Sequence, residues 1–439
     1  MKPLIVNIIT LAILVLPHVI LPSDLSDLQK AIESANADAV KKILDEGVDV
    51  NTRRPFDGFT PLMMAAQNGA TEIGQMLIDR GARIDEPSVL DETALTFAIE
   101  RDDHTFVTML LKNSAKVDYK TKLDQTPLLI AAGKGFAQIA GELIADGADI
   151  EAGVLNGKTT PLIKAAARGH LEIVKMLLEK NAGINAKEKG IWTALMLASQ
   201  NGFADVVRLL IERGADVNAR TALGETALMY AVEHGYYSIA DLLLQNQADV
   251  DSADTYQKTA LMRAASMGNM ELAKLLISHG AQINQATESG WSPLMFAIKN
   301  RQYDFARSFI KMGADTTIKN DKGQSAISLA RRDKADLIIL YEVPPAPKDG
   351  PEAILAELDY PRTARRAKIQ GTVIVKTHID STGAVLETQI AKSFGNQECD
   401  QAAMDAVQRV EWLPAIDEGK KLAVWIDVPV EFKLEEQGR

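Results

Sequence analysis

Few residues in this chain of 439 have the types and spacing that chemistry would require. Cys399 is its single cysteine, which excludes an internal disulfide and a cysteine metal cluster. It lies next to the start of a predicted helix, where a thiolate is favoured. His378 is the one histidine of the C-terminal part, and no Ser-His-Asp order, phosphate-binding glycine loop or metal-ligand spacing accompanies either residue. The sequence therefore predicts no enzyme, no cofactor and no metal.

The rest of the chain is dominated by a repeat. Nine short segments open with Thr or Ser, then Pro or Ala, then Leu or Ile, and their spacing is 33 residues with one interval of 34. A fixed period of this size predicts an α solenoid, because each unit must stack on its neighbours to bury its apolar face. The anchors are Thr60, Thr93, Thr126, Thr160, Thr193, Thr226, Thr259, Ser292 and Ser325.

Each repeat predicts two helices. After Thr193 as N-cap, residues 194–200 predict a short helix that Gly202 ends, and "FADVVRLLIERG" predicts a second helix that Gly214 ends. Upstream, residues 25–51 keep the two helices without the Thr entry, which is typical of a capping first unit. We expect an array of about ten units over residues 24–340.

These motifs resemble ankyrin repeats, whose signature is T-P-L-H-x-A with a "GADVN"-like exit. The signature histidine is replaced throughout, so we expect a more apolar seam between repeats. In ankyrin proteins the residue before each anchor faces the concave, partner-binding side. Three aromatic residues in that column suggest contacts with a protein partner, and the alternative is packing against the adjacent loop. They are Phe59, Trp192 and Trp291.

Charge argues against nucleic acid as a partner. The formal net charge is −11, and residues 360–439 hold 11 Lys and Arg against 12 Asp and Glu. The acidic excess therefore lies with the repeats, and an acidic array repels phosphate backbones.

The N-terminal residues predict export. Residues 3–21 are apolar except for Asn7, Thr10 and His18, and 19 residues at about 1.5 Å each span about 28 Å, just enough for a bilayer core. Segment 1–23 is either a membrane anchor or a cleaved signal peptide. Both alternatives place the repeats outside the cytoplasm.

After the repeats, the pattern changes. Prolines in residues 341–359 predict a short, stiff linker. Residues 371–379 and 384–392 alternate as a hairpin around the turn 380–383, and a helix is predicted from Asp400. Residues 422–434 predict a last strand, which Pro429 places at a sheet edge. We expect a small α+β domain with an antiparallel sheet over residues 360–434.

An opening "YP", a short basic helix, the hairpin, a helix, "WLPA" and a final "VPVEF" strand resemble the C-terminal domain of the TonB family. The resemblance implies a periplasmic domain that docks the plug segment of an outer-membrane transporter. A short peptide of the transporter, the family's "box", would add to the domain's last strand as an extra strand. Tyr360 and Pro361 would form the family's motif, and the last strand would offer the docking edge. The docking residues by position are Val424, Trp425, Ile426, Asp427, Val428 and Val430.

Two further expectations come with this resemblance. Arg362, Arg365, Arg366 and Lys368 form a basic cluster that either is a solvated helix face or contacts an acidic receptor plug or an anionic surface. Family transducers use a membrane-helix histidine to couple to a proton-driven motor complex, and His18 would take that role. The family's long Pro-rich spacer is missing, so the array would span the distance between the membrane anchor and the docking domain. The leading hypothesis is an envelope adaptor, and the alternative is a periplasmic scaffold without energy transduction.

Overall fold

Stacked helix pairs and a small sheet domain make up the computed structural model of this chain. It describes residues 23–153, 159–189, 191–332, 345–417 and 420–434. The predicted membrane segment, residues 3–21 with His18, lies outside the described residues. No helix in the described part of the chain combines the length and the apolar composition that crossing a membrane requires.

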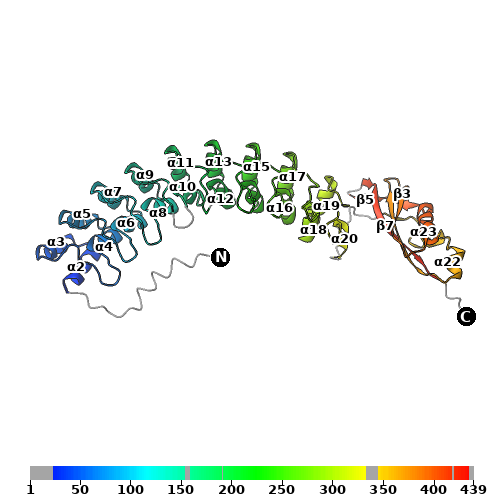
Figure 1. The fold of residues 1–439 in the computed structure, drawn as a ribbon, viewed down its shortest axis with the longest axis horizontal. Coiled ribbons are helices and arrows are strands. Elements are labelled where there is room, and N and C mark those ends of the chain that lie inside the picture. The colour runs from blue at the N-terminus through cyan, green and yellow to red at the C-terminus, as the bar shows by residue number, and fades with distance from the viewer. Residues whose placement is uncertain (1–22, 154–158, 190, 333–344, 418–419, 435–439) are drawn as a thin grey trace. The chain divides into compact units, whose positions relative to one another are not determined.

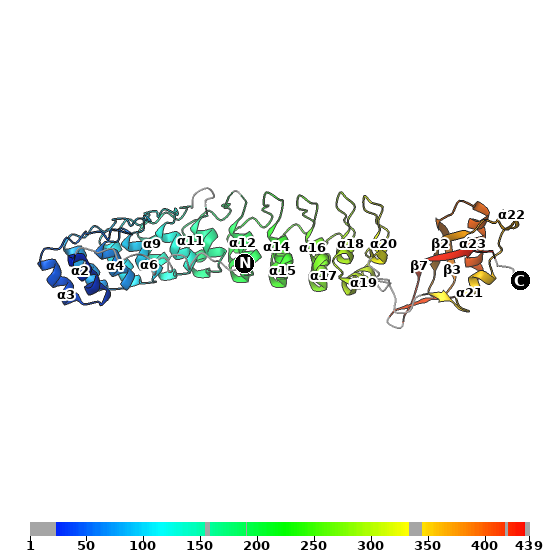
Figure 2. The ribbon, with the colours of Figure 1, turned by 90° about the horizontal axis from the view of Figure 1, so that it is seen from below.

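The chain divides into two units, residues 1–282 and 283–439. In the first unit, helix pairs follow one another, and the first and second helices of the pairs form two adjacent rows (Figure 1). The loops between pairs project from one side of these rows (Figure 2). The first helices are α2 (Ser23–Glu33), α4 (Pro61–Asn68), α6 (Ala94–Glu100), α8 (Pro127–Lys134), α10 (Pro161–Ala166), α12 (Ala194–Asn201), α14 (Ala227–Glu233) and α16 (Ala260–Met267). The second helices are α3 (Ala37–Asp45), α5 (Thr71–Asp79), α7 (His104–Lys112), α9 (Ala137–Ala145), α11 (Leu171–Glu179), α13 (Ala204–Glu212), α15 (Tyr237–Gln245) and α17 (Met270–Ser278).

The anchor threonines start the first helices, as the sequence predicts. The Thr193 hydroxyl accepts a hydrogen bond from the Met196 amide at 3.2 Å, which satisfies one of the free N–H groups at the helix start. Gly202 ends the same helix in the left-handed region, with φ 83°. Local capping therefore sets both ends of this helix.

Removing a buried cap tests this local control. Thr126 is completely buried, and its hydroxyl accepts from the Leu129 amide at 3.3 Å. We expect Thr126→Ala to lower the free energy of unfolding by about 1 kcal/mol. Urea unfolding followed by circular dichroism measures this, with Thr126→Ser as the control that keeps the hydroxyl. An equal loss in both variants would contradict a capping role.

The seam between repeats is apolar, as expected. Residues at the signature position are buried from Met63 to Met295. Thr96 is the polar member among them, and its hydroxyl donates to the Thr93 carbonyl at 2.7 Å. The apolar side chains at this position are Met63, Leu129, Ile163, Met196, Met229, Met262 and Met295.

The second unit begins with further helices of the repeat pattern and continues into the sheet domain. These helices are α18 (Pro293–Lys299), α19 (Tyr303–Lys311) and α20 (Ala326–Arg332). The sheet domain contains β1 (Ala346–Pro347), α21 (Glu352–Ala356), α22 (Arg362–Arg366), β2 (Gly371–Ile379), β3 (Val385–Lys392), α23 (Gln397–Arg409), β4 (Trp412–Leu413), β5 (Ala415–Asp417), β6 (Lys420–Leu422) and β7 (Val424–Phe432).

The main sheet has the antiparallel order β3-β2-β7. Its register pairs Gly371 with Phe432 and Ile374 with Pro429. The predicted hairpin is confirmed, and so is the edge position of the last strand, because Pro429 lies in a strand at the end of this order. α23 contacts the sheet and contributes Ala403, Ala406 and Val407 to the core.

Two sequence predictions of element limits differ from the structure. α23 starts at Gln397 rather than Asp400, because the Asn396 side chain caps it by accepting from the Cys399 amide. Part of the predicted linker belongs to the sheet domain: β1 pairs with β4, and Ile354 lies in the domain core. Residues far along the chain bury the apolar side chains of this stretch. The proline content of the stretch does not reveal that burial.

Candidate protein-docking surfaces

The residues that precede the anchors form contacts between successive repeats. Phe59 is buried, with its ring centroid 4.7 Å from that of Phe97 on the next repeat's first helix. Trp192 repeats this contact with Tyr230, at 4.9 Å between centroids. Both pairs are 38 residues apart. For Phe59 and Trp192 the structure shows the packing alternative, while partner contact by the half-buried Trp192 stays a prediction.

The third aromatic residue packs within its own repeat. The Trp291 ring lies 5.6 Å from Phe296, and the Lys299 ammonium lies 5.0 Å from its centroid. Trp291 is half-buried, so part of its surface is open to solvent. Its role in binding a partner also stays a prediction.

Glu225, which also precedes an anchor threonine, joins a largely buried ionic cluster. Arg263 donates to Glu225 Oε1 at 3.0 Å and to Asp254 Oδ2 at 2.9 Å, and it also pairs with Glu233. The Tyr230 hydroxyl donates to Glu225. Burial and the hydrogen bond to the Glu225 carboxylate raise the pKa of Tyr230, so this phenol remains a donor at neutral pH. The cluster ties two successive loops to the helices α14 and α16.

Large apolar side chains are exposed at the tips of the loops between repeats. Leu123 exposes 76% of its surface and Tyr256 68%, and Leu90 and Leu223 are exposed as well. Each stands three residues before an anchor threonine, so its position could have been found from the sequence. Adjacent tips are joined by backbone hydrogen bonds, such as Lys122 N to Leu90 O at 3.0 Å. Neighbouring tips therefore carry exposed apolar side chains in pairs, Leu90 with Leu123 and Leu223 with Tyr256.

The predicted docking strand β7 divides its side chains between two faces. Val424, Val428 and Val430 are buried in the domain, so their side chains are unavailable to a partner. What remains at the edge is the backbone. The pairing of β7 with β2 continues without interruption through Pro429. Because proline has no N–H to donate to β2, the nitrogen of Pro429 faces the outer edge of the sheet. The backbone groups of Trp425 and Glu431 have the same orientation.

The sheet face opposite α23 carries an aromatic pair beside this edge. The His378 and Trp425 rings stack with centroids 4.7 Å apart and an interplanar angle of 13°. The Lys376 ammonium lies 5.4 Å from the Trp425 ring centroid. Trp425 is half-buried and is the docking residue whose side chain adjoins the edge. Ile426 is half-buried and packs against the domain core, and Asp427 is half-buried and pairs in register with Lys376.

Tyr360 does not have the exposure that a receptor contact requires. Its side chain is only 7% exposed, its ring packs edge-on against Phe432 with centroids 5.2 Å apart, and its hydroxyl donates to the Ile369 carbonyl. Pro361 beside it is half-buried. The sequence could not reveal this burial, because Phe432 lies far along the chain.

The basic cluster is exposed on α22. Arg362, Arg365 and Arg366 are all exposed, and the Arg365 guanidinium lies 5.3 Å from the Tyr360 ring centroid. The structure thus keeps both sequence alternatives for this helix, a solvated face and an electrostatic contact. Receptor contact by these arginines stays a prediction.

Cys399 is a core residue, although its place beside a helix start would favour a thiolate. Cys399 is completely buried in the domain core. Burial, with Asp400 and Glu398 nearby, raises the pKa of its thiol. A side chain that stays protonated and inaccessible is a packing residue.

Taken with the fold, these surfaces define a solenoid of helix pairs joined to a small domain with an open sheet edge. The chain belongs to the ankyrin-repeat proteins: the family model "Ankyrin repeats (3 copies)" matches residues 28–121, 95–188, 184–254 and 251–320. The model "Gram-negative bacterial TonB protein C-terminal" matches residues 356–434. Both are non-catalytic protein-interaction families, so this is a protein-binding protein with a TonB-like domain.

Individual relatives match one part of the chain each. The protein tonB2 of Pseudomonas aeruginosa is 40% identical over 76 residues, covering 17% of this chain and 28% of the relative. The protein TonB of Vibrio cholerae is 35% identical over 89 residues, covering 20% and 36%. The ankyrin repeat and SAM domain-containing protein 6 of Danio rerio is 32% identical over 162 residues, covering 36% and 22%. This chain thus spans no more than 36% of these relatives' length.

Among solved structures, the human ASB11 ankyrin repeat domain is similar to the array. It is 26% identical, with a TM-score of 0.45, and the match covers 51% of this chain and 98% of that chain.

Proposed function

We propose that this chain is a bacterial cell-envelope adaptor that binds one protein partner along its ankyrin array and docks an outer-membrane transporter through its TonB-like domain. The observation that carries the proposal is the open edge of β7 within a domain similar to bacterial TonB proteins. An edge strand presents backbone donors and acceptors that an incoming peptide strand satisfies. The exposed loop tips supply the apolar surface for the second partner.

A proline at the edge tests strand addition. Glu431 is exposed, and its N–H faces away from β2, so Glu431→Pro removes an edge donor without removing a bond of the sheet. We expect about fivefold weaker binding of synthetic plug segments from TonB-dependent transporters of the same organism, because one hydrogen bond contributes about 1 kcal/mol. Fluorescence anisotropy with the full chain measures this.

Glu431→Ala is the matched control, because it removes the same side chain and keeps the N–H. We expect it to bind as the unchanged protein does. If no plug segment binds the unchanged chain, or if both variants bind equally, docking by strand addition is wrong.

Energy transduction needs a further condition, which is a retained membrane segment. A cleaved protein cannot pull against the inner membrane. The N-terminal residue and membrane association of the protein from its own cells therefore decide between the two functions. An intact Met1 in the inner membrane supports transduction, with His18 as the motor-coupling residue. A mature N-terminus near Asp24 in the soluble periplasmic fraction supports the scaffold function alone.

A further inference from the structure

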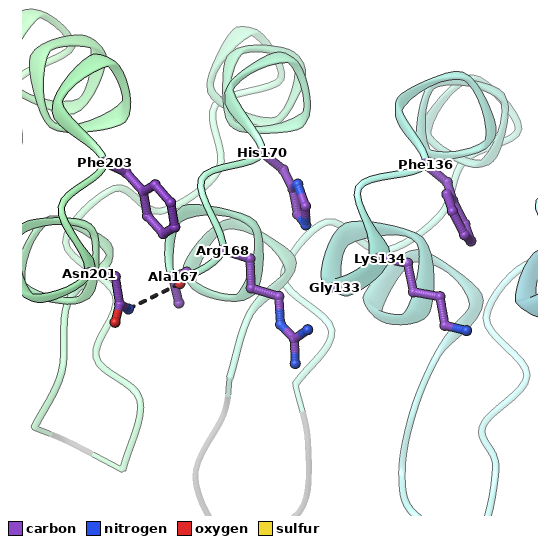
Figure 3. A pocket seen from close by; sticks show the side chains of 8 residues that line it. All are labelled: Gly133, Lys134, Phe136, Ala167, Arg168, His170, Asn201 and Phe203. Carbon is purple, nitrogen blue, oxygen red and sulfur yellow. Dashed lines mark hydrogen bonds between the residues drawn. The ribbon is translucent and has the colours of Figure 1, made fainter. Parts of the chain in front are cut away.

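A groove crosses three successive repeats at the turns between their first and second helices. It has a volume of about 610 Å³. Phe136, His170 and Phe203, each at the N-cap of a second helix, line it with their rings pointing the same way (Figure 3). This face is distinct from the loop tips and from the TonB-like domain.

The rings are held at a fixed spacing by the backbone of the preceding repeat. A Cβ added to Gly135 would lie 2.5 Å from His170 Cε1, and one added to Gly169 would lie 2.5 Å from Phe203 Cδ1. The His170 and Phe203 rings therefore rest directly on glycines. Successive rings stand 34 and 33 residues apart, which is one repeat in space, or about 10 Å. The groove thus offers regularly spaced ring faces.

The charge of the groove is positive, although the chain carries a formal net charge of −11. Lys134 and Arg168 line it beside the rings, and no carboxylate residue is among the lining side chains. Lys134 pairs with Glu100, which lies outside the lining. Arg168 is exposed and makes no ion pair with any described residue, so its guanidinium is available to an incoming anion.

Lys164 adds to this positive field. Its side chain lies over Gly133, where an added Cβ would be 2.7 Å from Lys164 Cε, and its ammonium donates to Gln125 at 2.5 Å. Burial and the neighbouring Arg168 lower the pKa of Lys164, and the carboxylates of Glu100 and Glu188 oppose this shift. A carboxylate bound near Arg168 would relieve this like-charge repulsion.

We propose that this groove binds an acidic, extended segment of a protein partner. Its carboxylate would pair with Arg168, and its apolar side chains would enter the spaces between the rings. Two repeat steps of about 10 Å each require about six residues at about 3.3 Å per residue. A single carboxylate between apolar groups fits this lining better than a polyanion, which the acidic array repels.

Selection of displayed random peptides of about ten residues on the full-length chain tests the proposal. We expect the selected peptides to share an Asp or Glu flanked by apolar residues. Anisotropy should then show at least tenfold weaker binding to Arg168→Glu and to Phe203→Ala, and weaker binding as salt is raised.

Arg208→Glu is the matched control, because Arg208 is exposed on α13, does not line the groove, and undergoes the same change of charge. It should bind as the unchanged chain does. Circular dichroism of each variant checks that the array remains folded. The proposal is overturned if no peptide is selected, if the selected peptides lack acidic residues, if Arg168→Glu binds like Arg208→Glu, or if a single-stranded oligonucleotide binds more tightly than the peptides.

Discussion

Replacing Tyr360 by alanine is expected to remove most of the stability of the TonB-like domain. Truncating a buried aromatic side chain costs about 3–5 kcal/mol, and a small domain has only about 5–15 kcal/mol in total. The ring fills the space beside Phe432, which is itself completely buried. Tyr360→Phe keeps that packing and loses only the hydrogen bond to Ile369, so we expect it to cost about 1 kcal/mol.

Hydrogen exchange of the full chain, read by mass spectrometry in peptides from β2 and α23, measures this domain separately from the array. Tyr360→Ala should exchange much faster in both peptides, and Tyr360→Phe only slightly faster. Unchanged protection in Tyr360→Ala, together with lost binding of transporter plug segments, would instead make Tyr360 a contact residue, as its place in the family motif suggests.

The second large effect is expected at Arg263. Its alanine variant leaves Glu225 and Asp254 without a counter-charge, and the Asp254 side chain is only 4% exposed. Breaking a buried ion pair by removing one partner costs about 3–5 kcal/mol. Glu233 is half-exposed and should contribute little, since water screens its charge.

Urea unfolding followed by far-ultraviolet circular dichroism checks this prediction. Arg208→Ala is the control, because Arg208 is exposed in the same array, and we expect a change within about 0.5 kcal/mol. Equal unfolding midpoints for the two variants would show that the cluster contributes nothing. A local loss is also detectable at Trp192, whose ring contacts Tyr230 next to the cluster.

The repeat architecture was predictable because its signals are local. The anchor threonines cap helices, Gly202 ends one in the left-handed region, and the alternation in residues 371–379 marks a half-buried strand. The edge position of β7 was predictable for a similar reason, because Pro429 lacks the N–H that an inner strand needs.

The candidate sites were less predictable. The sequence predicted the edge position of β7, but it did not separate its buried valines from Trp425 on the open face. It placed Cys399 near a helix start, where a thiolate is favoured. The opposing core buries this thiol, which no local pattern reports.

By itself, the sequence determined the period of the array, the limits of most helices, the hairpin and the strand that ends the sheet. These properties depend on capping, glycine conformation and alternation, which act over a few residues. Only the tertiary structure decided that Tyr360 is a core residue, that Trp192 packs on Tyr230 one repeat later, and that three rings and Arg168 line one groove. The physical reason is that burial and charge pairing depend on residues brought together from 30 or more positions away, which spacing along the chain does not specify.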